Sequence, residues 1–138
     1  MAHTNTFRIL YAATYQDDVE LFSAALPVPN VEIVTARTAK EALKHSRTQR
    51  FDLCITETRF PDGSGFELCR QLHEIDRSLP VIFFTGDAGE FHRRLGLQSG
   101  AAWYLVKPYF ERLMCVVENR LAAWDPAFRR RLIWSKAA

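Results

Sequence analysis

The chain has 138 residues, of which 48% are hydrophobic and 25% are charged, and its formal net charge at pH 7 is +2. This length and composition predict one globular domain with its own hydrophobic core and exclude a disordered or fibrous protein. The net charge is too small to indicate nucleic-acid binding, and no apolar run approaches the ~18 residues of a membrane span. We therefore expect a cytoplasmic protein with neither nucleic acid nor a membrane as its partner.

Apolar runs rich in β-branched residues alternate along the chain with stretches of helical periodicity. In chain order these patterns predict five strand and helix pairs, at 7–13 and 14–26, 31–36 and 38–49, 51–56 and 66–75, 80–85 and 87–99, and 102–106 and 108–123. Pro27 and Pro29 end the first helix. Thr38 and Glu41 have the spacing of a capping box, and Gly100 suits a C-terminal helix cap.

The cysteines are odd in number, Cys54, Cys69 and Cys115, and lie within predicted strands or helices without Cys-x-x-Cys spacing. This pattern predicts buried free thiols and argues against a disulfide framework. We expect no metal ligands among them.

The basic character of the chain is concentrated at its C-terminal end, where residues 125–138 contain four basic residues and one acidic residue. Asp125 and Pro126 are the residue types favoured at the N-cap and at the first position of a helix. We predict a domain at 1–123 and a basic, helical extension at 124–138. The extension could fold back on the domain, form a homodimer or contact an acidic partner, and its arginines are weak support for nucleic-acid binding.

Five strands alternating with five helices predict an α/β fold, with a parallel sheet covered by helices on both faces. In such a sheet, the carboxyl ends of the strands meet at one edge, where open α/β sheets place their binding chemistry. The residues expected at this edge are Ala13, Thr14, Glu57, Thr85 and Lys107.

The span from about residue 7 to residue 123 resembles a response-regulator receiver domain. The features that carry the resemblance are the PDGSG loop after Glu57, Thr85 at the end of PVIFFT, and the segment SGAAWYLVKPY, which contains Tyr104, Lys107 and Pro108 in the expected order. The resemblance implies a flavodoxin-like (βα)5 fold with strand order 2-1-3-4-5. It also implies a two-component signalling module that accepts a phosphoryl group from a sensor histidine kinase.

The chain departs from this family at the phosphoacceptor site. The resemblance implies an aspartate at the end of the third strand, with Mg²⁺ held by it and by an acidic pair after the first strand. Here Glu57 takes the first position, and Ala13 and Thr14 take the positions of the pair. Mg²⁺ binding is therefore expected to be weak or absent, and the chain is not expected to be an enzyme. We expect Asp17 and Asp18 to cap and charge the first helix rather than bind metal.

Glu57 has two interpretations. Its carboxylate could pair with Lys107 and bond Thr85, imitating part of a phosphorylated state. Alternatively, Glu57 and Lys107 form only a structural ion pair, which need not add net stability. Both interpretations predict a domain that does not turn over phosphate.

The resemblance also implies a switch, in which the hydroxyl of Thr85 and the ring of Tyr104 move together and alter a partner surface. The residues expected at this surface are Trp103, Tyr104, Phe91, Arg94, Tyr109 and Arg112. Partner-contacting aromatic and arginine side chains often dominate binding, although an aromatic on a terminal strand also fits β-propensity alone. The expected partner is a sensor histidine kinase or another response regulator, and a homodimer is a further arrangement.

The sequence thus predicts a receiver-like module that acts by phosphorylation-independent protein contact. The alternative is a residually active phosphoacceptor, in which Glu57 or a displaced Asp17 completes a distorted site. A nucleotide or flavin binder is disfavoured, because the segment AATYQDD lacks the glycines that let a backbone approach phosphate.

Overall fold

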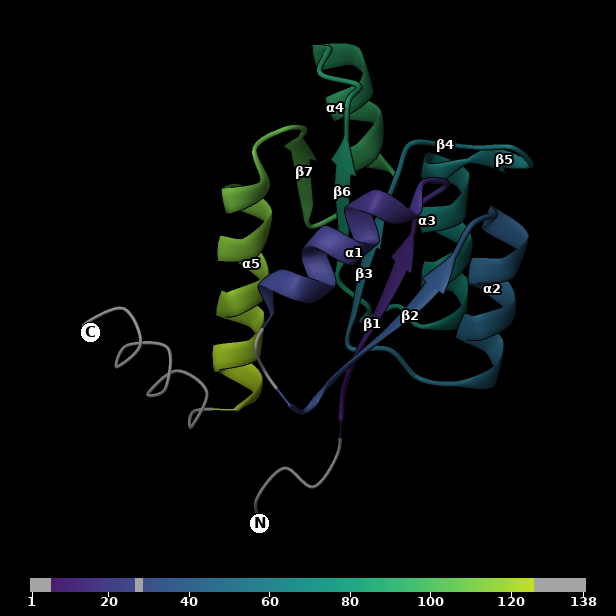
Figure 1. Ribbon diagram of the computed structural model, residues 1–138. Coiled ribbons are helices and arrows are strands. Elements are labelled where there is room, and N and C mark those ends of the chain that lie inside the picture. Colours follow the sequence, from purple (N-terminus) through teal and green to yellow (C-terminus); the bar gives the residue numbers. More distant parts are fainter. Residues whose placement is uncertain (1–5, 27–28, 126–138) are drawn as a thin grey trace.

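The computed structural model describes residues 6–26 and 29–125 (Figure 1). Its main sheet is parallel and has the order β2-β1-β3-β6-β7, with bounds β1 Phe7–Ala12, β2 Val31–Ala36, β3 Leu53–Thr56, β6 Val81–Thr85 and β7 Trp103–Val106. Taken in chain order, these strands have the predicted order 2-1-3-4-5. The flavodoxin-like α/β fold is therefore confirmed.

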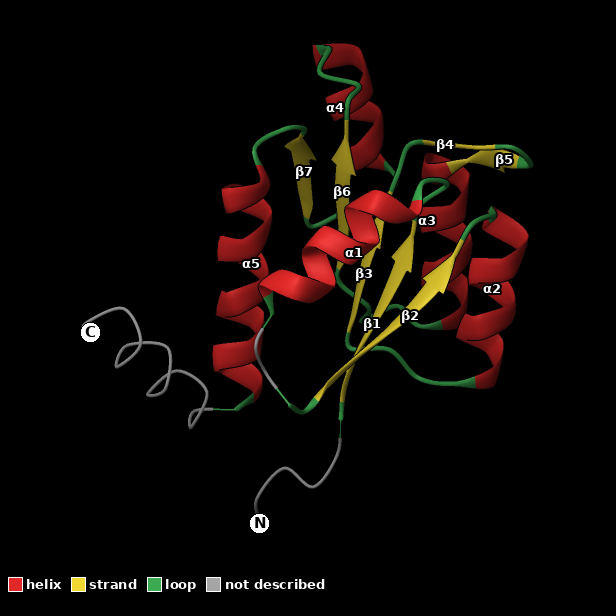
Figure 2. Cartoon of the chain, viewed as in Figure 1, coloured by secondary structure: helices red, strands yellow, loops and turns green. Residues whose placement is uncertain are grey.

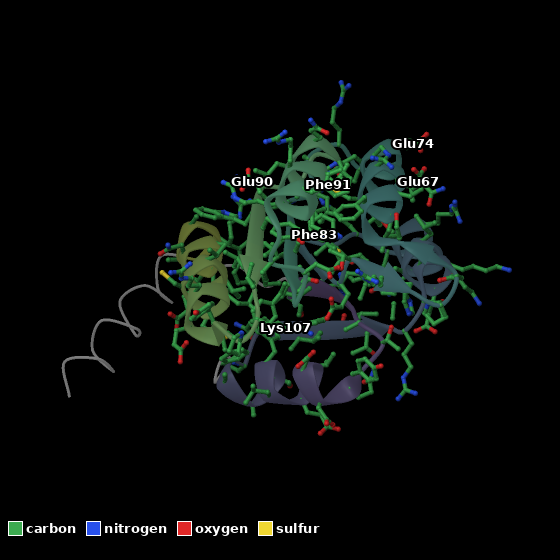
Figure 3. The ribbon with its side chains drawn as sticks, turned by 90° about the horizontal axis from the view of Figure 1, so that it is seen from above. Glu67, Glu74, Phe83, Glu90, Phe91 and Lys107 are labelled. Atoms are coloured by element: carbon green, nitrogen blue, oxygen red, sulfur yellow. The ribbon has the colours of Figure 1, made fainter. Side chains whose placement is uncertain are left out.

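Helices cover both faces of the sheet, as the view from above shows (Figure 3). Their bounds are α1 Gln16–Ala25, α2 Ala39–Thr48, α3 Gly65–Ile75, α4 Glu90–Gln98 and α5 Phe110–Trp124. Helices α1 and α5 bury side chains such as Phe22, Val117 and Leu121 against one face. Helices α2 and α3 bury Leu43 and Leu68 against the other. Because both faces are covered, the strands read as continuous apolar runs.

The loop between β3 and α3 forms a short antiparallel hairpin, β4 Arg59–Phe60 and β5 Gly63–Ser64, where the sequence indicated only a loop (Figure 2). Its turn residue Asp62 accepts hydrogen bonds from the backbone N–H groups of Ala39 and Lys40, both at 2.9 Å. The turn therefore caps the N-terminus of α2 from a distance.

Local helix ends follow the sequence signals closely. Thr38 Oγ1 accepts from the backbone N–H of Glu41 at 3.0 Å, which confirms the predicted cap. Gly100 follows α4 with a φ of 108°, the left-handed conformation that glycine adopts most easily.

Two expectations need correction. Cys115 is exposed, whereas Cys54 and Cys69 are buried free thiols as predicted. Trp124 belongs to α5 and packs edge-on against Phe7 with the ring centroids 5.3 Å apart, because the apolar face of α5 continues beyond residue 123. The predicted helix after Asp125 lies outside the described residues.

None of the helices described is both long and apolar enough to cross a membrane.

Candidate functional site

The carboxyl ends of the central strands form a cleft of about 390 Å³. It is lined by Thr14, Tyr15, Glu57, Thr58, Arg59, Phe60, Pro61, Thr85, Gly86 and Asp87. A smaller pocket of about 140 Å³ lies on the side of α1 and α5 and includes Asp18, Lys107 and Pro108. Ala13 is buried in the hydrophobic core below this edge.

Lys107 is the centre of the first polar cluster. Its Nζ donates to Asp18 Oδ2 at 2.5 Å and also to Glu57 Oε2. The backbone fixes both ends of this contact, since Glu57 N donates to the carbonyl of Ala12 at 3.0 Å and Lys107 N to that of Thr85 at 2.8 Å. The sheet register thus brings together two residues that lie 50 positions apart.

Burial and hydrogen bonding have opposite effects on the pKa of Lys107. Burial alone lowers it, but the hydrogen bonds to Asp18 and Glu57 outweigh burial, so the pKa lies above the ordinary value of 10.5. The ammonium group is therefore charged at neutral pH. Two carboxylates and one ammonium leave the cluster with one net negative charge.

Asp18 is the residue of this cluster that the sequence interpretation missed. Tyr15 is the N-cap of α1 and provides no side-chain cap, and the exposed Asp17 lies in the first turn beside Asp18. Both aspartates lie in the first turn of α1, where they were expected to charge the helix end, but the N-cap residue has no side-chain hydrogen bond and Asp18 also bonds Lys107. The signal was its position in the first helical turn after β1, at the sheet edge where Lys107 also lies.

A second polar cluster surrounds Thr85. Of the described residues, Thr58 and Asp87, rather than Glu57, bond its hydroxyl: Thr58 Oγ1 lies 3.0 Å away, and the backbone N–H of Asp87 donates to it at 3.1 Å. The predicted bond between Glu57 and Thr85 is therefore not formed. Thr58 is buried behind the cleft, where its hydroxyl takes the place expected for Glu57.

The Asp87 carboxylate accepts from Thr58 Oγ1 at 2.6 Å and from the Arg59 guanidinium at 3.2 Å. These contacts hold the pKa of the Asp87 carboxyl below its ordinary value, with the Thr58 hydrogen bond as the largest cause. The sequence interpretation named none of these three residues as part of the site. Their partnership depends on two loops meeting, and the only available signal was that both loops follow neighbouring strands.

Tyr104 points inward. Its hydroxyl donates to the backbone carbonyl of Asp87 at 2.6 Å, and its ring packs against Phe83 with the centroids 5.6 Å apart. Burial is the main reason that its pKa rises to about 12. Gly96 of α4 lies so close to the ring that an added Cβ would fall 2.5 Å from Tyr104 Cδ2.

The remaining residues of the predicted partner surface lie outside this buried network. Trp103 on the edge strand β7 is 50% exposed, and Phe91 on α4 is 70% exposed. Tyr109 is exposed beneath the guanidinium of Arg112, which lies 5.1 Å from the ring centroid. Arg94 is also exposed.

The sequence profile described as "Response regulator receiver domain" matches residues 14–118. The chain belongs to this receiver family. It is 40% identical over 97 residues to the transcriptional regulatory protein CreB of Escherichia coli K12, an alignment that covers 70% of this chain and 36% of CreB. It is 31% identical over 105 residues to the regulatory protein PhoP of Bacillus subtilis 168, which controls alkaline phosphatase synthesis, with coverage of 76% and 44%. This receiver domain thus spans less than half of either relative.

Solved structures show the same relationship. The non-phosphorylated HemR receiver domain from Leptospira biflexa superposes with a TM-score of 0.74 at 29% identity, covering 83% of this chain and 94% of that one. Receiver domains are regulatory parts of two-component systems and interact with histidine kinases and other proteins.

The residues of this receiver domain do not fit the Mg²⁺ ion that the family implies. Mg²⁺ requires near-octahedral oxygen ligation. Within residues 6–26 and 29–125, no group of three or more histidine, cysteine or acidic side chains is placed to hold a metal. The carboxylates of Asp18 and Glu57 both bind the ammonium of Lys107 instead.

Proposed function

We propose that this receiver domain works in two-component or phosphorelay signalling by phosphorylation-independent contact with another protein. Glu57 takes the position of the phosphoacceptor aspartate, and the acidic pair after β1 is replaced by Ala13 and Thr14. The observation that carries the proposal is the bonding of Lys107 to both Asp18 and Glu57. A cationic side chain thus occupies the place between the carboxylates and compensates one of their two negative charges without metal.

Glu57 supplies a fixed negative charge rather than a transferable group. One carboxylate carries a charge of −1, whereas a phosphoryl group carries about −1.5 to −2 and three acceptor oxygens. The mimicry is therefore limited to holding Lys107. The inward position of Tyr104 supports a partner surface that is set before any modification occurs.

The partner surface consists of Trp103, Phe91, Arg94, Tyr109 and Arg112 around the buried Tyr104. Exposed aromatic and arginine side chains are the residue types that contribute most to protein interfaces. A sensor histidine kinase or another response regulator is the proposed partner, and a second copy of the chain is the further arrangement. We assign the domain to residues 1–124, because α5 ends at Trp124, and the basic extension to residues 125–138.

One observation favours a second candidate, a residually active phosphoacceptor. Asp18, in place of the displaced Asp17 predicted from the sequence, brings a second carboxylate to the pocket beside Glu57. Displacement of Lys107 would free both carboxylates as oxygen ligands. A carboxylate can also act as a nucleophile.

Titration with Mg²⁺ separates the two candidates. Isothermal calorimetry would compare the unaltered chain with Glu57→Gln and Asp18→Asn, using Glu74→Gln, an exposed change on α3, as the matched control. Protein contact without phosphorylation predicts no saturable heat in any of the four proteins. Saturable binding that is lost in Glu57→Gln and Asp18→Asn, but kept in the control, would establish the second candidate.

A further inference from the structure

The loop between β6 and α4 is closed by a ring of hydrogen bonds that starts and ends on Asp87. The backbone N–H of Asp87 donates to Thr85 Oγ1, and Thr58 Oγ1 donates to the Asp87 carboxylate. A threonine hydroxyl has a single proton to donate. Because Thr58 gives its proton to Asp87, the 3.0 Å contact between the two hydroxyls must be a donation from Thr85 to Thr58.

The ring leaves Thr85 without a proton for Glu57. The cluster around Glu57 bonds through Lys107 and Asp18, whereas the cluster around Asp87 bonds through Thr58, Arg59, Thr85 and Tyr104. In the described chain, the two clusters share no side-chain hydrogen bond. The hydrogen bond that orients Tyr104 is therefore anchored separately from the hydrogen bonds of Glu57.

Thr58, which anchors this ring of hydrogen bonds, is buried and is also held through its backbone. The carbonyl of Thr58 accepts from the N–H of Gly65 at the start of α3 at 2.8 Å, and Thr58 is 2% exposed. Arg59 adds an ion pair to Asp87 at 3.2 Å from the solvent side. Asp87 is thus held from both sides, and its own carbonyl receives the Tyr104 hydroxyl at 2.6 Å.

We propose that Asp87 is the positioning residue that holds Tyr104 inward and sets the partner surface, independently of Glu57 and of any phosphoryl group. The acceptor of the Tyr104 hydroxyl is the backbone of Asp87, so the carboxylate acts through the position of the loop. This inference rests on the proposed function, because it explains how the contact surface is set without phosphorylation.

The test follows the four tyrosines of the chain individually. The full chain is labelled with 3-fluorotyrosine, its ¹⁹F NMR spectrum is recorded without phosphodonor, and Tyr104→Phe assigns the Tyr104 signal. The variants are Asp87→Ala, Thr58→Val and Glu57→Gln. Asp76→Ala is the matched control, because Asp76 is also a loop carboxylate that accepts local hydrogen bonds, from Ser78 at 2.7 and 3.0 Å.

We expect the Tyr104 signal to shift toward the position of free 3-fluorotyrosine in Asp87→Ala and in Thr58→Val, and to stay in place in Glu57→Gln and Asp76→Ala. The signals of Tyr11, Tyr15 and Tyr109 should keep their positions, which a general loss of structure would not allow. If Asp87→Ala does not fold, Thr58→Val and Arg59→Ala replace it, and both should shift the Tyr104 signal in the same direction. Arg59→Ala should leave the core intact, because the Arg59 side chain is 77% exposed.

An unmoved Tyr104 signal in the folded Asp87 or Thr58 variant would overturn the inference. A shift of the Tyr104 signal in Glu57→Gln that equals the shift in Asp87→Ala would also overturn the inference. That result would not contradict the proposed phosphorylation-independent contact. The proposed function fails by a different observation, the formation of a phosphoryl adduct, which this experiment does not involve.

Discussion

Lys107 places an ammonium group beside two carboxylates at the edge of the sheet. Its ammonium group bonds Asp18 and Glu57 at the sheet edge and compensates one of their two charges. An ammonium group has three donors and one positive charge, so it cannot organise oxygen ligands around a transferring group as a divalent cation does. These contacts support the proposal that the site holds charge rather than transferring a phosphoryl group.

The charge pair predicts a pH-dependent loss of stability in Glu57→Gln. The pKa of Lys107 is raised in the folded state, so its contribution is fully present below the ordinary lysine pKa and is lost as pH rises through the higher folded value. At pH 7 we expect a loss of about 1.5–3 kcal/mol in the free energy of unfolding, as for a hydrogen bond to a charged group. Urea denaturation between pH 7 and pH 11 measures it.

The difference between the unaltered chain and Glu57→Gln should narrow as the pH approaches 11. Glu74→Gln, on the exposed side of α3, should behave like the unaltered chain throughout. A difference that stays constant across this range would show that the Lys107 ammonium does not stabilise the fold through Glu57.

Among the elements, α4 and β7 meet at an unusually close contact. Alanine in place of a helical glycine ordinarily stabilises a helix by about 1 kcal/mol. In Gly96→Ala, the new Cβ would lie 2.5 Å from Tyr104 Cδ2 and 3.0 Å from Cε2. Overpacking typically costs about 1–3 kcal/mol, so we expect net destabilisation and an outward shift of the tyrosine ring.

Thermal unfolding and the fluorotyrosine spectrum check this expectation. Gly86→Ala is the control, because nothing lies within 4 Å of a Cβ built at Gly86. A Gly96→Ala protein that is more stable than the unaltered chain would contradict it, because the Tyr104 ring would then move aside at no net cost.

The hairpin turn is a second point where elements depend on one another. Asp62 caps α2 through two backbone N–H groups, and these hydrogen bonds hold the pKa of its carboxyl below the ordinary value of 3.8. Loss of a helix cap costs about 1 kcal/mol, which we expect for Asp62→Ala at pH 7. Because the folded pKa is depressed, this contribution is present above the ordinary aspartate pKa and is lost as pH falls through the folded value.

Chemical denaturation at pH 7 and near pH 2.5 checks the Asp62 cap. Glu74→Ala, an exposed acidic residue without a capping position, is the control. An Asp62→Ala effect of the same size at both pH values would argue against the charge of Asp62 as its source.

At the scale of the whole molecule, the fold was predictable because its signals are local and repeated. Each strand is an apolar run and each helix has its own period, and parallel pairing then fixes the shared edge. The contact between Glu57 and Lys107 followed from that edge alone. The contact between Asp18 and Lys107 could not be predicted in this way, because the direction of the Asp18 side chain depends on how α1 packs.

The hydrogen bonds of Asp87 with Thr58 and Thr85 could not be predicted from sequence patterns. Thr58 and Asp87 lie 29 positions apart in separate loops, and no spacing motif connects them. The sequence pattern predicts Thr85 at the end of its strand, but the partner of its hydroxyl depends on which group lies within hydrogen-bonding distance. Tertiary geometry decides which nearby group the Thr85 hydroxyl bonds, and a local sequence pattern contains no information on that geometry.

The proposed function requires that this receiver domain act without being phosphorylated, and intact mass spectrometry shows whether a phosphoryl group is taken up. The purified chain is incubated with acetyl phosphate and Mg²⁺, quenched under mildly acidic conditions and weighed intact by mass spectrometry, beside a receiver domain with a complete acidic site. We expect the control to gain a phosphoryl group while the mass of this chain stays unchanged. A phosphoryl adduct mapped to Glu57 would contradict the claim and return the chain to the receivers that switch by phosphorylation.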